Sequence, residues 1–177
     1  GGRARLDVLR WTEIADSLFG GHTRLVVHGI SMGAATTMML SGEELPSCVK
    51  CFVEDCGYTS VRDQFAKELR GQFGLPAFPL LDVASWLCGL KYGWTFGEAS
   101  SLKQVARCDR PMFFIHGDAD DYVPTAMVYP LYEAKPGEKE LWVVPGAAHA
   151  LSYRDNRAEY TRRVGEFVGR YIPEERN

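Results

Sequence analysis

Four short runs of apolar residues recur along the chain, separated by longer segments that contain turn-forming and polar residues. Within each run the apolar character is continuous rather than alternating, which is typical of strands that helices cover on both faces of a parallel sheet. The runs predict strands over residues 24–28, 51–54, 112–116 and 140–144.

The segments around these runs carry helical patterns, because apolar residues recur on one face of a 3.6-residue period or fill a short segment throughout. They predict helices over residues 6–19, 32–40, 126–134 and 154–171. Strand and helix therefore alternate, which predicts an α/β fold with right-handed crossovers.

One stretch, residues 59–101, interrupts this alternation. It contains no strand-like run but two helix-like pieces, 61–70 and 80–90, and its aromatic and leucine content is too high for a solvated linker. An ordered insertion of this length usually covers something. We expect a helical cap over the functional site, with residues 1–58 and 102–177 forming the core; the alternative is that the insertion only buries apolar surface at a sheet edge.

Composition limits the function classes. The 177 residues are 46% hydrophobic and 24% charged, which fits one domain with a buried core. A formal net charge of -3 gives no reason to expect a nucleic-acid partner. No apolar run reaches the ~18 residues that a membrane span needs. Residues 1–6 lack the apolar core of a secretory segment, which favours the cytoplasm. Because the alternation of strands and helices begins in the middle of a domain, the compartment stays open.

The five cysteines are an odd number, scattered through apolar segments. Cys48 and Cys51 form a C-x-x-C pair, which could serve redox chemistry or half a zinc site, but the sequence offers neither a second pair nor a histidine pair to complete it. We therefore expect reduced thiols, no metal and no cofactor.

The sequence Gly29-Ile30-Ser31-Met32-Gly33 is a G-x-S-x-G motif between a predicted strand and a predicted helix. In this setting the serine lies on a sharp, strained turn that exposes its hydroxyl, and we expect both glycines to be needed because a Cβ would strike a neighbouring element. The Met32 N–H at the helix N-terminus could stabilise an oxyanion. The alternative is a serine that only caps the helix.

A nucleophilic serine needs a base, and the base needs an acid that orients it. His149 lies in a loop after the last predicted strand, from which it could reach Ser31, whereas His22 precedes the first strand and His28 and His116 end strands directly before glycine. We therefore predict His149 as the base.

Four carboxylates are candidates for the acid. Asp118, Asp120 and Asp121 follow the third predicted strand, and Asp55 follows the second. Spacing alone cannot choose among them, and at least two must be ordinary turn residues.

Together, the segments G-I-S-M-G, H-G-D-A-D-D-Y-V-P and G-A-A-H-A resemble the α/β-hydrolase superfamily, in particular the bacterial serine-aminopeptidase-like or lipase-like hydrolases with a helical cap. The resemblance covers nearly the whole chain. It implies a catalytic triad of Ser31, Asp120 and His149, and a serine hydrolase that cleaves an ester or amide bond of a hydrophobic small-molecule or peptide acyl substrate. Acyl transfer to a thiol or amine is chemically adjacent.

The family's sheet has about eight strands, and its second oxyanion donor comes from an early loop, whereas this chain supplies only what resemble the last four strands. The N-terminal strands are thus expected to be missing, and the strand at 24–28 to expose an unpaired edge. A second hypothesis follows: the chain is a catalytically silent partial domain that pairs with a missing N-terminal half.

Overall fold

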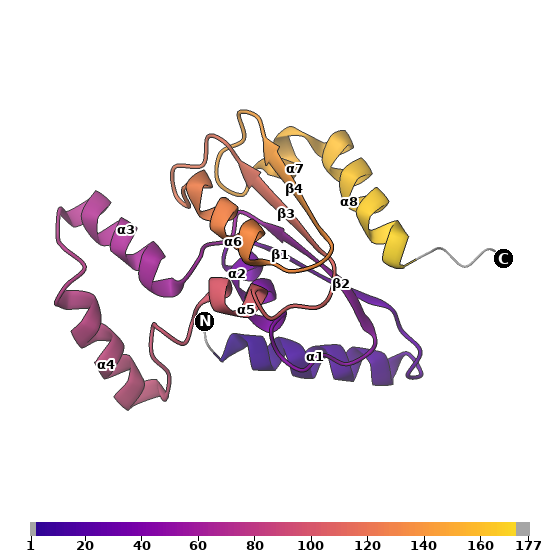
Figure 1. The fold of residues 1–177 in the computed structure, drawn as a ribbon, viewed down its shortest axis with the longest axis horizontal. Helices are drawn as coiled ribbons and strands as arrows, with labels where there is room; N and C mark the ends of the chain where they lie inside the picture. Colours follow the sequence, from indigo (N-terminus) through magenta and orange to yellow (C-terminus); the bar gives the residue numbers. More distant parts are fainter. Residues whose placement is uncertain (1–2, 173–177) are drawn as a thin grey trace.

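The computed structural model describes residues 3–172 and contains one four-stranded parallel sheet (Figure 1). The spatial order follows the sequence, β1-β2-β3-β4. All four predicted strands are confirmed, with ends that differ from prediction by one or two residues: β1 Leu25–Ile30, β2 Val49–Asp55, β3 Met112–Gly117 and β4 Lys139–Val144.

Helices cover both faces of this sheet, and Figure 1 shows α8 on the side opposite α1 and α2. Along β3, Met112 and Phe114 pack in one apolar cluster, and Phe113 and Ile115 in the other, as the two-residue period of a strand requires. The helices on the first face are α1 Ala4–Leu18, α2 Met32–Leu40, α5 Ser101–Val105 and α6 Val128–Ala134, whereas α8 Arg157–Tyr171 packs on the second.

Three details of the predicted helices were wrong. The helix expected over residues 154–171 is two helices, α7 Ser152–Asp155 and α8, because Asn156 leaves helical backbone angles (φ -132°, ψ 40°). The helix expected at 126–134 begins with a 3₁₀ turn, η1 Thr125–Met127. Helix α5 was not predicted, because five residues are too short to show a helical period.

Residues 59–101 form α3 Val61–Phe73 and α4 Leu80–Tyr92, which lie beside the sheet rather than on either face of it (Figure 1). They pack through Val61 and Leu81 against Ala35 and Met39 on the outer side of α2. The opposite side of α4 remains solvent-exposed, with Trp86 62% exposed. The role of this insertion as a lid stays a prediction.

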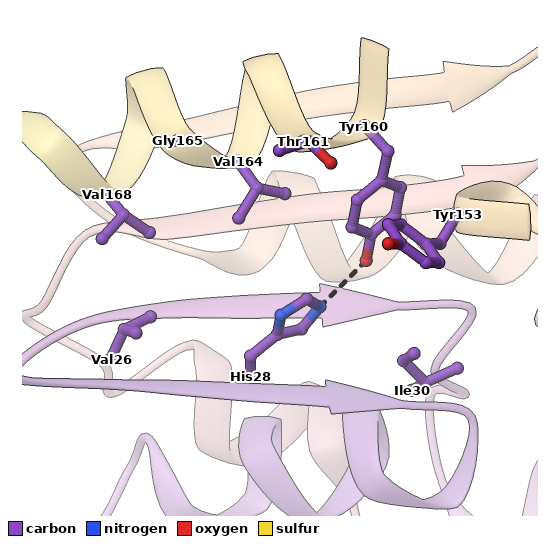
Figure 2. Close-up of a pocket in the computed structure, with 9 residues that line it drawn as sticks. All are labelled: Val26, His28, Ile30, Tyr153, Tyr160, Thr161, Val164, Gly165 and Val168. Carbon is purple, nitrogen blue, oxygen red and sulfur yellow. Dashed lines mark hydrogen bonds between the residues drawn. The ribbon is translucent and has the colours of Figure 1, made fainter. Parts of the chain in front are cut away.

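The expectation that all four strands are buried on both faces is wrong for β1, where Val26 is 37% and Ile30 43% exposed. The reason is that α8 covers this face of β1 only in part; β1 is also an edge strand, and no other strand pairs with its outer edge within residues 3–172. An apolar groove of about 550 Å³ runs between β1 and α8 (Figure 2). In it His28 Nε2 lies 2.9 Å from the Tyr160 hydroxyl.

Within residues 3–172, no helix combines the length and apolar character that crossing a membrane would require.

Candidate active site

Ser31 occupies the turn between β1 and α2 in a strained conformation, with φ 56° and ψ -116°. A Cβ at Gly29 would lie 2.3 Å from the backbone carbon of Gly33, so the turn requires glycine at position 29. The expectation for Gly33 itself was wrong: a Cβ there would meet nothing within 4 Å, because the close approach involves only its backbone.

His149 lies in the loop after β4, and its ring is held on both sides. Its Nε2 lies 2.7 Å from Ser31 Oγ, and its Nδ1 lies 2.8 Å from Asp120 Oδ2. A carboxylate can only accept, so Nδ1–H donates to Asp120 and Nε2 is left to accept from the serine hydroxyl. The structure thus brings the three predicted residues together in the geometry of a base between a nucleophile and an acid.

Asp120 is buried and receives several hydrogen bonds. The Tyr122 and Val123 N–H groups donate to Oδ1 at 3.0 and 2.8 Å. Burial opposes ionisation of the Asp120 carboxyl, but the hydrogen bonds from His116, His149 and Val123 outweigh it and lower its pKa. Asp120 is therefore held as a carboxylate beside His149.

The other three candidate acids lie elsewhere. Asp118 Oδ1 accepts from the Gly146 N–H at 2.6 Å, and Asp121 is exposed. Asp55 accepts from Ser152 Oγ at 3.0 Å, and burial raises the pKa of its carboxyl to about 6. Asp55 and Asp118 thus contact the two ends of the loop that carries His149, without contacting His149 itself in any hydrogen bond of the described residues.

The remaining histidines are separate from Ser31 as predicted, but one of them adjoins the site. His22 is exposed, and His28 lies in the groove beside β1. His116, by contrast, is fully buried, with Nε2 3.3 Å from Asp120 Oδ2. Sequence reasoning set it aside because it ends a strand.

Met32, the predicted oxyanion donor, is the first residue of α2. Its N–H has no acceptor within the helix, because the first four N–H groups of a helix have none, and it adjoins the Ser31 hydroxyl at the positive end of the helix dipole. The position is suited to a developing negative charge; the donor role stays a prediction.

A cavity of about 300 Å³ opens beside Ser31, between the sheet and α3. Most of its wall is apolar or aromatic, contributed in large part by Tyr58 and by Val61, Phe65 and Trp94 of the predicted cap, residues 59–101. Its lining residues are Ser31, Met32, Tyr58, Val61, Gln64, Phe65, Trp94 and Tyr122.

Donor atoms of Cys56, Asp120 and His149 lie within 4.8 Å of one another, a spacing that could suit a metal ion. Two of these atoms already share the hydrogen bond between His149 and Asp120. Burial also raises the pKa of the Cys56 thiol, which disfavours the thiolate that a metal binds. Asp120 and His149 therefore fit the hydrogen bonds that join them to each other and to Ser31 better than they fit a metal site.

A model of the prolyl oligopeptidase family matches residues 5–175. The chain is also 35% identical over 142 residues to YqkD, an uncharacterized protein of Bacillus subtilis (strain 168). That match covers 80% of this chain and 47% of YqkD, so the chain spans about half of this relative.

Among solved structures, an esterase of Pyrococcus furiosus is similar at a TM-score of 0.72 and 25% identity, over 97% of this chain and 63% of the esterase. The acylaminoacyl peptidase of Pyrococcus horikoshii shares the fold at a TM-score of 0.70 and 17% identity, over 98% of this chain and 28% of that protein. The α/β-hydrolase fold predicted from the three motifs is thereby confirmed, and the structures that share it include esterases and peptidases.

Proposed function

Because this chain belongs to the prolyl oligopeptidase family, we propose that it carries the catalytic centre of a serine hydrolase, with Ser31 as nucleophile, His149 as base and Asp120 as acid. The observation that carries the proposal is the line of hydrogen bonds from Ser31 Oγ through the His149 ring to Asp120, at 2.7 and 2.8 Å. A serine hydroxyl is a weak nucleophile at neutral pH, and this arrangement is what activates it.

In the proposed reaction, His149 Nε2 takes the proton of Ser31 as Oγ attacks the acyl carbon. The Met32 N–H donates to the oxyanion that forms. His149 then gives its proton to the leaving alcohol or amine, and the carbonyl–heteroatom bond breaks to leave an acyl-enzyme. Water attacks this ester in a second round with the same proton transfers, which releases the acid and restores Ser31. Asp120 stabilises the imidazolium in both rounds.

The substrate class follows from the cavity beside Ser31. Its apolar and aromatic walls suit a hydrophobic acyl group better than a sugar or a highly charged group. The bond cleaved is an ester or an amide, in a small molecule or a peptide. If a thiol or amine replaced water in the second round, the same site would act as an acyltransferase.

A second candidate is a catalytically silent unit that pairs with an N-terminal half of a longer polypeptide. The observation that favours it is the edge of β1, unpaired within residues 3–172, beside the apolar groove under α8 (Figure 2). A further strand could satisfy the backbone groups of this edge, and a helix could fill the groove.

A fluorophosphonate probe, which reacts with activated serines, tests both candidates. The wild-type chain should be labelled and Ser31→Ala should not, whereas Ser17→Ala, which changes an exposed serine of α1, should be labelled like the wild type. If the chain alone is unlabelled but the complete natural polypeptide reacts at Ser31, the second candidate holds. If neither reacts, the serine-hydrolase proposal is wrong.

The acyl preference is tested with p-nitrophenyl esters of increasing acyl length. The matching p-nitroanilides test whether the bond cleaved is an ester or an amide. We expect kcat/KM to rise with acyl length until the cavity is filled. Equal turnover of charged and apolar acyl groups would contradict the assigned substrate class.

A further inference from the structure

The loop between β3 and η1, residues 118–124, carries Asp120 and is also held from the predicted cap. Two side chains of α3 donate hydrogen bonds to backbone carbonyl oxygens of this loop. Gln64 Nε2 lies 3.0 Å from the carbonyl oxygen of Tyr122. Lys67 Nζ lies 2.7 Å from that of Asp121. Both bonds act on the two residues that directly follow Asp120, and neither α3 residue takes part in the proposed reaction.

The orientation of the Gln64 amide is settled by its neighbours. Its nitrogen lies 3.0 Å from the Tyr122 carbonyl oxygen and 3.3 Å from Glu68 Oε1. A carbonyl and a carboxylate can only accept, so the amide nitrogen must face them. Gln64 is 6% exposed, and its Oε1 has no hydrogen-bond partner within residues 3–172. An apolar side chain would fill this position without burying an unpaired atom, so the bond to the loop is what the amide contributes.

Lys67 holds the same loop from its exposed side. Its side chain is 32% exposed, but its ammonium group has three partners. Besides the Asp121 carbonyl, Nζ lies 2.9 Å from Glu68 Oε1 and 5.4 Å from the centre of the Tyr122 ring, within range of cation–π attraction. These contacts restrain a side chain that would otherwise be free at the surface. Lys67 thus contacts the loop through its backbone and through an aromatic ring.

Tyr122 connects these contacts to the triad in two ways. Its N–H donates to Asp120 Oδ1 at 3.0 Å, while its carbonyl accepts from Gln64. Its ring packs against the His149 ring, with the centroids 4.9 Å apart and the planes at 60°. A shift of this residue would therefore move a hydrogen-bond donor of the acid and the aromatic neighbour of the base together.

Helix α3 also forms one wall of the cavity beside Ser31, through Val61, Gln64 and Phe65. Lys67 is not among the described residues that line this cavity. The helix that would contact a bound acyl group is therefore also the helix that holds the acid loop. Gln64 contacts both the cavity and the loop, whereas Lys67 contacts the loop without lining the cavity.

We propose that Gln64 and Lys67 are positioning residues: they hold residues 120–123 in place, and with them the contacts that this segment makes to His149. The inference rests on the proposed serine-hydrolase function. A displacement of about 1 Å can cost on the order of 10²-fold in rate, even when the change lies outside the reacting groups. Other bonds remain, such as that from His116 Nε2 to the Val123 carbonyl at 2.9 Å, so we expect the loop to loosen rather than to unfold.

The test centres on Lys67, in whichever form reacts with the fluorophosphonate at Ser31, the chain or the complete natural polypeptide. Lys67→Met keeps an unbranched side chain without the donor, whereas Lys67→Arg keeps a cationic donor that can reach the same carbonyl. We expect Lys67→Met to lower kcat for a p-nitrophenyl ester roughly tenfold with KM unchanged, and Lys67→Arg to restore most of this loss.

Lys103→Met is the matched control. It removes a lysine bond of the same kind, to the Gly97 carbonyl oxygen at 3.2 Å, which involves no residue of the loop. Its kcat should equal that of the wild type.

A pH profile separates positioning from a simple effect of charge. If Lys67 acted only as a cation near His149, its removal would stabilise the imidazolium, move the acid midpoint of kcat/KM upward and leave the plateau of kcat unchanged. Positioning predicts a lower plateau. The low-field proton resonance of His149 Nδ1–H should also shift in Lys67→Met and return in Lys67→Arg. Because Lys67 is a surface residue, the melting temperature of Lys67→Met should stay within about 2 °C of the wild type.

Gln64→Met serves as an independent variant, since it keeps the length of the side chain but removes the amide. It should shift the same resonance and lower kcat, and it should change KM as well because Gln64 lines the cavity.

The inference is overturned if Lys67→Met keeps the plateau kcat of the wild type, if Lys67→Arg or Lys103→Met is as impaired as Lys67→Met, or if Gln64→Met leaves the resonance unchanged. Failure of the proposed function looks different: neither form would be labelled at Ser31, while the His149 resonance would still respond to Lys67→Met.

Discussion

The ends of β2 and β3 each present a buried carboxylate to the same loop, yet the two differ in ionisation. Asp120, after β3, is 6% exposed and its pKa is lowered. Asp55, at the end of β2, is 1% exposed and its pKa is raised to about 6. Both side chains are shielded from solvent, but Asp55 lies deeper in the protein, so the difference comes from its stronger desolvation as well as from the hydrogen-bond donors that each carboxyl receives.

Asp120 accepts from two backbone N–H groups and from His149, with His116 at 3.3 Å, all of which favour the charged form. Asp55 receives hydroxyl hydrogen bonds from Ser152 and Tyr160, which are not enough to offset its burial. A buried carboxyl at a strand end thus stays ionised where the N–H groups of the following loop point at it, as those of residues 122 and 123 point at Asp120.

The largest effect in this comparison is expected from Asp120→Asn. The Tyr122 and Val123 N–H groups hold the amide oxygen at the Oδ1 position, so the amide NH2 faces His149 Nδ1 and favours the wrong tautomer, and ester turnover should fall by roughly 10³–10⁴. Steady-state kinetics of the wild type and the variant at one pH measure it. Equal turnover in Asp120→Asn, with the loss appearing in Asp55→Asn instead, would reverse the assignment of the acid.

Asp55→Asn should have a much smaller effect. The amide oxygen can still accept from Ser152 Oγ, so the start of α7 behind His149 stays anchored. We expect turnover to fall by no more than about tenfold, because Asp55 acts only on the position of the loop. Since protonated Asp55 is already neutral below pH 6, the ratio of wild-type to variant activity should approach one as the pH is lowered from 7 to 5.

The contrast also shows which parts of the site the sequence could predict. Strands and the Ser31 turn depend on local patterns, a run of apolar residues or a G-x-S-x-G between strand and helix, and these were predicted to within one or two residues. The choice among Asp55, Asp118 and Asp120 depends on which N–H groups a loop turns inward, which no local pattern encodes; the superfamily resemblance supplied it.

Glu54 could have been noticed, because a glutamate that ends an otherwise apolar strand-like run is unusual. Its place opposite Phe114 could not, since pairing across β2 and β3 depends on register. The break at Asn156 was equally hidden, because the apolar period continues across it and only the docking of α7 beside Asp55 separates the two helices.

A third prediction concerns stability at the end of β2. The pKa of Glu54 is raised from 4.5 to about 8 in the folded protein, so its stabilising contribution is complete below pH 4.5 and is lost as the pH rises towards 8. Glu54→Gln has no such loss. The melting temperature of Glu54→Gln relative to the wild type should therefore increase between pH 4.5 and 8, by on the order of 10 °C. A difference that is constant across this range would contradict ionisation of Glu54 inside the sheet.

The smallest effect is expected at Asp118, which tests whether the loop after β3 positions His149 through more than Asp120. Its Oδ1 accepts from the Gly146 N–H at 2.6 Å, at the start of the loop that carries His149. Because Asp118 is exposed and other contacts hold the same loop, Asp118→Ala should lower kcat only about twofold to fivefold with KM unchanged. Asp121→Ala is the matched control: it is another exposed aspartate of this turn whose side chain makes no hydrogen bond within residues 3–172, and its kcat should equal that of the wild type. An equal loss in both variants would mean that the negative charge of the turn, rather than the bond to Gly146, acts on His149.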